Sequence, residues 1–402
     1  MITAEGGGFA RRWAEIEPVG RAASGGYRRF AWTAEDALLR EWFAGETAAL
    51  GLDLTVDRAG NQWAWWGDPD ATPGIVTGSH LDSVPDGGAF DGPLGVVSAL
   101  AAVEALKDEG FTPGKPLGVV NFVDEEGARF GVACAGSRLI TGAMSADRAA
   151  GLRDADGTSI PEAMRSAGQD PRHLGRDDET LQRIGTFVEL HVEQGRALAT
   201  PEYGDAPIGV GTAIWPHGRW RFDFAGEANH AGTTRLADRH DPMLGYASTV
   251  LAAREFAGAH DAVATFGKLL VEPNGVNAIP SLVRAWLDAR APSESSVQGV
   301  LRDLTAAARD LGATVTEESW TGNTAFDTSL ADRLSQILGG APLLGTGAGH
   351  DAGILATAGV STGMLFVRNP TGISHSPAEF AQEADCVAGV EALTTVLREL
   401  AS

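Results

Sequence analysis

Cysteine is nearly absent from this chain, because its 402 residues include only Cys134 and Cys386. Two cysteines cannot build the disulfide framework that stabilises many secreted proteins. No apolar run is long enough to span a bilayer, and the first twenty residues contain no apolar segment typical of a secretory signal. We therefore expect a protein of the reducing cytoplasm.

Positive charge is scarce as well. Lys and Arg number 31 against 53 Asp and Glu, which gives a formal net charge of −22 at pH 7. Such a surface repels nucleic acid and anionic membranes, so we expect neither as a partner. Most of the excess carboxylates should lie on solvated surface, and only a few should hold cations. The hydrophobic content of 44% is ample for a large core, and the length favours more than one domain.

Apolar strands alternate with helical patterns in the first half of the chain. Strands are predicted at 74–80, 116–123 and 186–192, and helices at 33–51 and 94–106. The first helix has Thr33 as a possible N-cap and Gly51 as a stop, and the second is apolar nearly all round. Continuous apolar strands separated by helices indicate an α/β fold with a mostly parallel sheet between helices.

Residues 211–325 show a different pattern. GRWRFDFAG and SLVRAWLDARAP alternate as strands do, and each is followed along the chain by a helical segment. These strand–helix units predict a small α+β domain inserted into the first one. The first domain is expected to comprise residues 1–210 and 326–402.

Polar clusters follow three of the predicted strands, namely SHLDS, DEEG and HVEQG. Because parallel strands open at one edge of a sheet, the three clusters should lie close together. The side chains that could bind a metal there are His80, Asp82, Asp91, Glu125, Glu126, His191 and His375. Histidines with a bridging carboxylate suit two divalent cations such as Zn²⁺ or Mn²⁺, which at a separation of ~3.5–4 Å can activate one water.

Two further expectations concern the carboxylates. Asp82 can accept a hydrogen bond from the second ring nitrogen of His80 and orient the ring. Glu125 and Glu126 would point in opposite directions on an extended strand, so both reach one site only if the chain bends, which Gly127 permits. One glutamate could then be a ligand and the other a general base.

Each cluster alone has a plainer interpretation. A single histidine at a strand end is more often structural, DEEG is more often a solvated turn, and GGAFDG is a turn-rich loop. Glycine-rich loops also bind phosphates, but nothing here matches a P-loop or a dinucleotide-binding motif. The clusters together, in order and at strand ends, favour the metal site.

Several long stretches resemble one family. GSHLDSVPDGGAFDGPLGV, VDEEGARFG, ELHVEQG, NHAGTT, GAGHDA and GISHSPAE together resemble the hydantoinase/carbamoylase amidases of the M20 metallopeptidase superfamily. That family includes N-carbamoyl-L-amino-acid hydrolases, beta-ureidopropionase and allantoate amidohydrolases. The resemblance extends from about residue 30 to the C-terminus. It implies a metal-bearing catalytic domain and an inserted lid that also forms a homodimer. We expect GRWRFDFAG to be an edge strand of the lid that can pair across the two-fold axis.

The resemblance assigns roles to the residues at the strand ends. Asp91 corresponds to a ligand that bridges two divalent ions, and Glu125 to the general base that takes a proton from water. The other implied ligands are His80, Glu126, His191 and His375. Zn²⁺ and Mn²⁺ are the expected ions, with Co²⁺ and Ni²⁺ as alternatives.

The resemblance also assigns residues that contact the substrate. His230 corresponds to a lid histidine that reaches the partner subunit's active site and supports the oxyanion. Asn277 and Arg290 correspond to lid residues that hold the substrate carboxylate, for which an arginine fork is a natural partner. Gln194 corresponds to a residue near the ureido group. From the residues alone, His230 and Arg290 would each be interpreted as surface strand residues.

Four positions depart from the family pattern. His217 lies where allantoate hydrolases usually carry glutamine, and Arg368 lies where a less charged residue is common. Arg235 replaces a proline after HAGTT, and Ser281 replaces a glycine after NAIP. All four bear on which ureido compound is the substrate and leave the metal chemistry untouched. We expect His217 to contact the substrate.

The function predicted from the sequence is therefore a binuclear metal-dependent amidohydrolase. It would cleave the ureido C–N bond of an N-carbamoyl-L-amino acid or related ureido acid and release ammonia and CO2. Hydrolysis of allantoate or of another N-acyl amino acid is the alternative, and a non-catalytic binding protein is a more distant one. A peptidase is less favoured, because EQG and GAGHDA are typical of the amidases.

Overall fold

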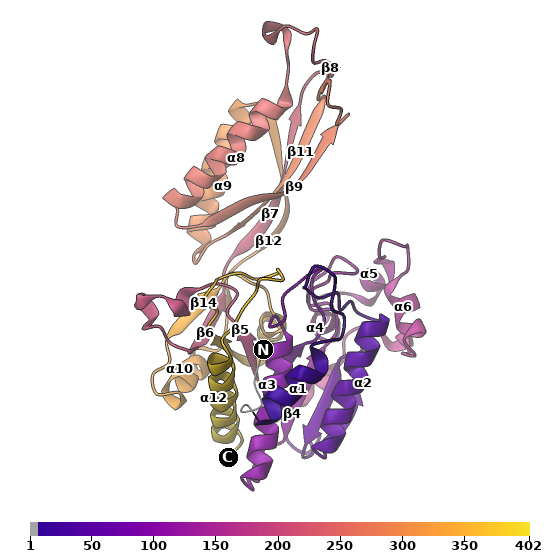
Figure 1. Ribbon diagram of the computed structural model, residues 1–402, viewed down its shortest axis with the longest axis vertical. Helices are drawn as coiled ribbons and strands as arrows, with labels where there is room; N and C mark the ends of the chain where they lie inside the picture. The colour runs from indigo at the N-terminus through magenta and orange to yellow at the C-terminus, as the bar shows by residue number, and fades with distance from the viewer. Residues whose placement is uncertain (1–6) are drawn as a thin grey trace. The chain divides into compact units, whose positions relative to one another are not determined.

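The computed structural model describes residues 7–402 (Figure 1). The chain divides into two compact units. One contains the chain up to Ala213 together with Ala325–Ser402, and the other contains Ile214–Thr324. None of the helices within residues 7–402 combines the length and apolar composition needed to cross a bilayer.

The first unit is built on a nine-stranded sheet. The strand order along its main path is β1-β2-β4-β3-β5-β15-β6-β13, and β14 pairs with β6. Neighbours among β4, β3, β5 and β15 run parallel, whereas β1, β2 and β6 join antiparallel at the flanks. The strands are β1 (Asp53–Val56), β2 (Gln62–Trp66), β3 (Gly74–His80), β4 (Leu117–Phe122), β5 (Ile184–Val192), β6 (Ile208–Ile214), β13 (Thr324–Ala325), β14 (Leu343–Thr346) and β15 (Ser361–Val367). The predicted α/β class with a largely parallel sheet is confirmed.

Helices cover both faces of this sheet. Every residue of β3 and β4 is buried, as expected for strands enclosed on two sides. On β5, the side chain of Leu190 packs near α12 (Glu383–Ala401), and its neighbour Glu189 accepts the first-turn amide of α11 (Asp351–Thr357). Because successive side chains point to opposite faces of a strand, α12 and α11 lie on opposite faces.

The remaining helices of the first unit complete these two layers. Helix α2 (Ala34–Ala49) begins as predicted, since the Thr33 side chain accepts the Asp36 amide, and Gly51 follows with a φ of 63°. Helix α3 (Pro93–Asp108) packs against α12 and against α1 (Gly7–Ile16). The others are α4 (Ala135–Thr141), α5 (Ala146–Gly151), α6 (Ile160–Ser166), α7 (Asp178–Gln182) and α10 (Thr328–Ile337).

The second unit is a four-stranded antiparallel sheet with two helices. Its order is β12 (Ala313–Thr321), β7 (His217–Ala225), β11 (Leu282–Arg290), β9 (Val263–Glu272). Alternate residues of β7 and β11 are buried, and they form a core with α8 (Pro242–Ala259) and α9 (Glu294–Asp310). A separate two-stranded ladder joins β8 (Asn229–His230) to β10 (Ala278–Ile279). The predicted α+β character of this region is confirmed.

Candidate metal centre

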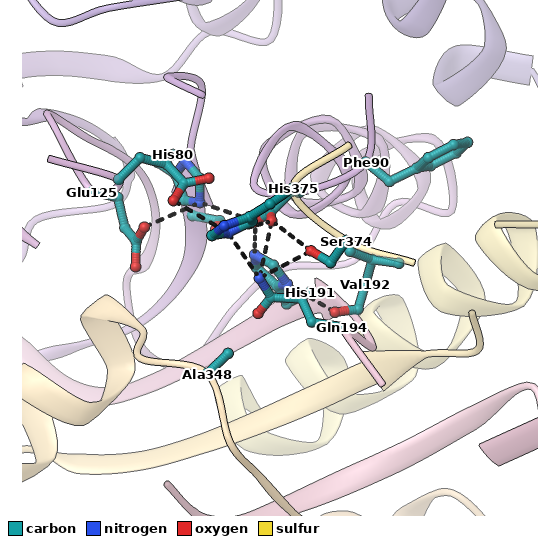
Figure 2. Close-up of polar contacts among 12 residues, drawn as sticks. His80, Phe90, Glu125, His191, Val192, Gln194, Ala348, Ser374 and His375 are labelled. Atoms are coloured by element: carbon teal, nitrogen blue, oxygen red, sulfur yellow. Dashed lines mark hydrogen bonds and ion pairs between the residues drawn. The ribbon is translucent and has the colours of Figure 1, made fainter. Parts of the chain in front are cut away.

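The three polar clusters follow the same ends of parallel neighbours. Strand β3 ends at His80, which is paired in register with Phe122 at the end of β4. Strand β5 carries His191 one residue before its end. Figure 2 shows His80, Glu125, His191, Gln194 and His375 converging on one place. The sequence prediction that these segments meet at one sheet edge therefore agrees with the geometry.

Two groups of potential ligands share one carboxylate. His80, Asp91 and His191 form one group, and Asp91, Glu126 and His375 form the other. Within each group the potential ligand atoms lie within 4.8 Å of one another. Asp91 Oδ1 is 3.8 Å from His80 Nε2 and 3.2 Å from His191 Nε2, and Asp91 Oδ2 is 3.4 Å from His375 Nε2. One carboxylate thus faces ligand atoms on both sides, as a pair of cations would require.

The two buried histidines present suitable atoms. His80 Nδ1 lies 3.1 Å from the backbone oxygen of Asp82, and His191 Nδ1 lies 2.9 Å from that of Val192. In the neutral tautomer with its proton on Nδ1, each ring donates to its carbonyl and leaves Nε2 with a lone pair for a cation. Among the described residues, neither Nε2 has a hydrogen-bond partner, and neither does Glu126 Oε1. Buried polar atoms without partners are costly, so these atoms fit the coordination of divalent cations.

The pKa values of the titratable groups in the cluster also favour a cation site. Burial and the nearby Asp91 raise the pKa of Glu126 to about 7, and burial followed by neighbouring carboxylates raises the pKa of Glu125 well above its usual range. A hydrogen bond with Asp91 and the charge of Glu126 raise the pKa of His375 to about 9, against the opposing effect of burial. The raised carboxyl pKa values reflect buried negative charges that repel one another, and bound divalent cations would offset this repulsion.

Asp82 differs from the expectation in its main contact. His80 Nδ1 lies 3.1 Å from the backbone oxygen of Asp82 and 3.5 Å from the carboxylate oxygen Oδ1 of the same residue. The carboxylate instead accepts the backbone amides of Glu125 at 3.1 Å and Glu126 at 3.0 Å. The buried Asp82 side chain therefore supports the glutamate pair as well as the histidine.

The bend that brings both glutamates to the site starts earlier than predicted. Asp124 has a φ of 55°, and Gly127 follows with a φ of 60°. A Cβ at Gly127 would lie 2.3 Å from the backbone of Val132, so this position also needs glycine for space. The two side chains then face different histidines. Glu125 Oε2 is 3.7 Å from His80 Nε2, and Glu126 Oε2 is 3.5 Å from His375 Nε2.

Several contacts around the cluster were not anticipated from the sequence. The Cys134 thiol donates a hydrogen bond to Glu125 Oε1 at 3.3 Å. Glu189 accepts the Ser79 hydroxyl at 2.7 Å, and with His191 and His350 it forms a third group of potential ligands. The GAGHDA motif contains His350, but only the fold places its ring 4.6 Å from that of His191.

Gln194 lies in the cluster, on the loop after β5. Its Nε2 donates to Asp91 Oδ2 at 2.9 Å and lies 3.4 Å from His375 Nε2. Within residues 7–402 its Oε1 has no hydrogen-bond partner. This oxygen is an acceptor of the kind that a ureido N–H group would need.

The other predicted substrate residues belong to the second unit and form two pairs. The exposed His230 is paired in register with Ala278, directly after the exposed Asn277. Arg290 is paired in register with His217 at one end of the four-stranded sheet. Burial lowers the pKa of His217, and the Arg290 charge adds to this effect. The roles of all four in substrate binding stay predictions.

Arg290 already has a carboxylate partner. Its Nε lies 2.7 Å and its Nη2 3.0 Å from the two carboxylate oxygens of Asp288. The two residues are separated by two positions on β11, so their side chains lie on one face of the sheet. Asp288 therefore orients the Arg290 guanidinium.

The positions that depart from the family pattern have partners within the chain. Arg368 forms a two-pronged ion pair with Asp385, with both distances 2.9 Å, and a second pair with Asp205. Arg235 pairs with Asp238 on the surface at 2.6 Å. Ser281 donates its backbone amide to the Glu272 carbonyl at 2.8 Å. The charges of both arginines are thus at least partly neutralised by these contacts.

Comparison with known proteins places the chain in a family. The model of peptidase family M20/M25/M40 matches residues 76–399. The chain is 36% identical to an N-carbamoyl-L-amino acid amidohydrolase of Geobacillus stearothermophilus, with 97% of each chain covered. It is 33% identical to an allantoate amidohydrolase of Bacillus subtilis (strain 168), with 96% of this chain and 95% of the relative covered.

Solved structures agree with these relatives. A hydantoinase/carbamoylase family amidase from Burkholderia multivorans matches with a TM-score of 0.85 at 30% identity, covering 100% of this chain and 98% of that one. A tripeptidase from Staphylococcus aureus, at 14% identity and a TM-score of 0.64, shares the fold alone. The chain therefore belongs to peptidase family M20/M25/M40 and, within it, to the hydantoinase/carbamoylase amidases.

Proposed function

We propose that this chain is a binuclear metal-dependent amidohydrolase that acts on N-carbamoyl-L-amino acids or related ureido acids. The observation that carries the proposal is the Asp91 carboxylate, which faces potential ligands in two groups at once. The names of relatives at 33% and 36% identity support a ureido substrate. One water would be consumed, and the products would be ammonia, CO2 and the free amino acid.

The ligands divide into two sets around Asp91. His80 and His191 would hold one cation with it, and Glu126 and His375 would hold the other. Zn²⁺ and Mn²⁺ suit this mixture of imidazole and carboxylate, and Co²⁺ and Ni²⁺ are alternatives. Two bound cations would polarise the ureido carbonyl and make a water molecule more acidic.

Glu125 is proposed to move the proton. Its Oε1 accepts the Cys134 thiol while its Oε2 faces His80, so the carboxylate is held with one oxygen toward the cluster. It would take a proton from water as the oxygen adds to the carbamoyl carbon. It would then pass that proton to the nitrogen that leaves when the C–N bond breaks.

The second unit is proposed to bind the substrate's other groups. The Arg290 fork would hold the α-carboxylate with help from Asn277, and His230 would support the developing oxyanion. His217, the register partner of Arg290, would lie beside the bound acid. Gln194 would contact the ureido group with its unpaired oxygen.

A homodimer through the second unit completes this proposal. The expectation that GRWRFDFAG is an edge strand is wrong, because this segment forms β7 and lies between β12 and β11. Strand β9 lies at one end of the four-stranded order and pairs, within the described chain, only with β11. Leu269 and Leu270 on this strand are exposed, as are Leu244 and Leu251 on α8. An edge strand beside exposed leucines can pair with a second copy across a two-fold axis. A reducing cytoplasm is proposed as its location, and the buried free thiols of Cys134 and Cys386 support this.

A substrate and metal panel tests the function. The protein is demetallated, loaded separately with Zn²⁺, Mn²⁺, Co²⁺ or Ni²⁺, and assayed for ammonia release from N-carbamoyl amino acids, allantoate and ureidoglycolate. We expect chelation to abolish activity and at least one metal to restore it on the N-carbamoyl acids. Activity restricted to allantoate would select the alternative that the Bacillus subtilis relative supports. Full turnover in a sample shown by elemental analysis to be metal-free would contradict the proposal.

A further inference from the structure

Glu379 is a buried carboxylate that lies beside the potential ligands without belonging to either group. The residue is only 6% exposed. Its Oε1 accepts the backbone amides of Phe90 at 2.8 Å and Asp91 at 3.0 Å. These amides belong to the loop that presents the Asp91 carboxylate. One glutamate oxygen therefore fixes the backbone of the residue shared by both ligand groups.

The second oxygen of Glu379 reaches the other ligand loop. Glu379 Oε2 lies 3.2 Å from Ser374 Oγ, and this hydroxyl lies 3.1 Å from Asp91 Oδ2. Ser374 directly precedes His375. Glu379 thus joins the loop that carries Asp91 to the loop that carries His375. The Asp91 amide that it accepts is 288 positions away in the sequence.

Packing holds the same segments together. The ring of Phe380, next to Glu379, meets the ring of Phe90 edge-on at 6.5 Å, and Phe90 stacks on Trp13 at 5.0 Å. Figure 2 shows Phe90 pointing away from the ligand cluster. The loop is therefore anchored by Phe90 while Asp91 faces the ligands. Gly88 makes room, since a Cβ there would lie 2.3 Å from Glu379 Oε1.

We propose that Glu379 is a positioning residue that holds Asp91 and His375 in the arrangement in which they bind cations. The inference rests on the proposed function, because the ligand roles of Asp91 and His375 do. Glu379 acts by accepting hydrogen bonds. Its removal would leave two backbone amides without their acceptor and free the loop that carries Asp91.

Two variants distinguish the hydrogen bonds that Glu379 accepts from the space that its side chain fills. Glu379→Ala removes both oxygens. Glu379→Gln keeps Oε1 for the two amides and offers its NH2 group to Ser374. Zn²⁺ or Mn²⁺ is titrated into demetallated protein, and the rise in Tm on adding metal is measured separately. We expect binding to weaken by about 10- to 100-fold in Glu379→Ala and to stay near that of the parent in Glu379→Gln.

Asp177→Ala is the matched control. Asp177 is also buried, and its carboxylate accepts the backbone amides of Arg58 and Thr180, which present no ligand. This variant should lower the Tm of the metal-free protein and leave the metal-induced rise unchanged. Where Glu379→Ala does not fold, Glu379→Asp, which shortens the side chain by one carbon, takes its place with the same expectation.

Three outcomes are informative. Unchanged metal affinity in Glu379→Ala would overturn the inference. A loss in Glu379→Gln as large as in Glu379→Ala would also overturn it, because acceptance of the amides would not be the cause. A parent protein that binds no divalent metal would instead refute the proposed function, so the two failures are distinguishable.

Discussion

Glu125 and Glu126 are adjacent in the chain and have different surroundings. The side chain of Glu125 contacts the Cys134 thiol and faces His80, whereas that of Glu126 faces His375. Asp82 accepts both of their backbone amides. These different contacts support different roles, with Glu125 in proton transfer and Glu126 in metal binding. Substitutions can test this assignment.

Glu125→Gln should retain metal and lose most of the rate. An amide cannot take the proton from water, and general-base assistance is worth about 10²- to 10⁴-fold. The measurements are kcat on an N-carbamoyl amino acid and metal content by elemental analysis. Glu126→Gln is the control and should lose metal. If the metal contents of the two variants are the other way round, the assigned roles are reversed.

Arg290→Ala should weaken catalysis on substrates with a free α-carboxylate. Loss of a charge-assisted two-pronged contact costs about 2–4 kcal/mol, or roughly 30- to 1,000-fold in kcat/KM. An amidated substrate lacks the contact from the start and should show little further loss. Arg219→Ala, which removes another arginine near Asp288, is the matched control. Equal losses on both substrates would argue against this role of Arg290.

The potential ligands in the two groups that share Asp91 could be predicted, because each is a chemically distinctive residue at a strand end or in a recognisable motif. Glu379 and Cys134 could not, although GISHSPAE contains the glutamate. Nothing in the local sequence indicates that Glu379 meets the amides of a loop 288 positions away. The bend at Asp124 was also missed, because aspartate adopts a positive φ far less often than glycine.

At the scale of elements, Asp327 joins a helix to a strand. Its Oδ1 accepts the Ser329 hydroxyl and the Leu330 amide at the start of α10, and its Oδ2 accepts the Ser361 hydroxyl at the start of β15. These hydrogen bonds, that of Ser329 first, lower the pKa of Asp327 to about 2. The charged carboxylate thus stabilises the folded state above the unfolded pKa of about 3.9, and this stabilisation is lost as the pH falls toward 2.

Asp327→Ala should therefore lower the Tm in a pH-dependent way. The loss at pH 7 should correspond to about 1 kcal/mol, as for other N-cap residues. The difference in Tm from the parent protein should shrink as the pH falls below about 4. Ser293→Ala removes the uncharged cap of α9 and should give a difference that does not change with pH. A pH-independent loss in Asp327→Ala would show that its charge contributes nothing.

Some of the other helices and strands could be predicted from the sequence, and others could not. Strands β3, β4 and β5 are continuous apolar runs before polar clusters, so they were predicted. Strand β2 was missed because its five residues, QWAWW, are too few for a clear pattern. Nearly all of them are buried, so apolar and polar residues do not alternate. The helices between 135 and 182 have seven residues or fewer, too short for a helical period to be recognised.

At the scale of the whole molecule, the proposed dimer predicts complementation. If His230 acts in the partner subunit's site, Glu125→Gln and His230→Ala should each be inactive alone and partly active when co-expressed. A mixed dimer would contain one site with both lesions and one with neither. Random pairing makes roughly half of the dimers mixed, so about a quarter of the sites should work.

The comparison is made with each variant purified alone and with the two purified from one culture. Size-exclusion chromatography with light scattering checks the oligomeric state. A monomer in solution would remove the basis of the prediction. A co-expressed mixture as inactive as its parents would show that His230 does not act across the interface.

The potential ligands are distributed along the chain from His80 to His375, with the whole second unit in between. During synthesis from the N-terminus, His80, Asp91, Glu126 and His191 leave the ribosome well before His375 and Glu379. A metal ion arriving early could meet one complete ligand group and only part of the other. If the two sites fill as proposed, the second ion can be bound fully only after the inserted unit and the segment that carries His375 have been made.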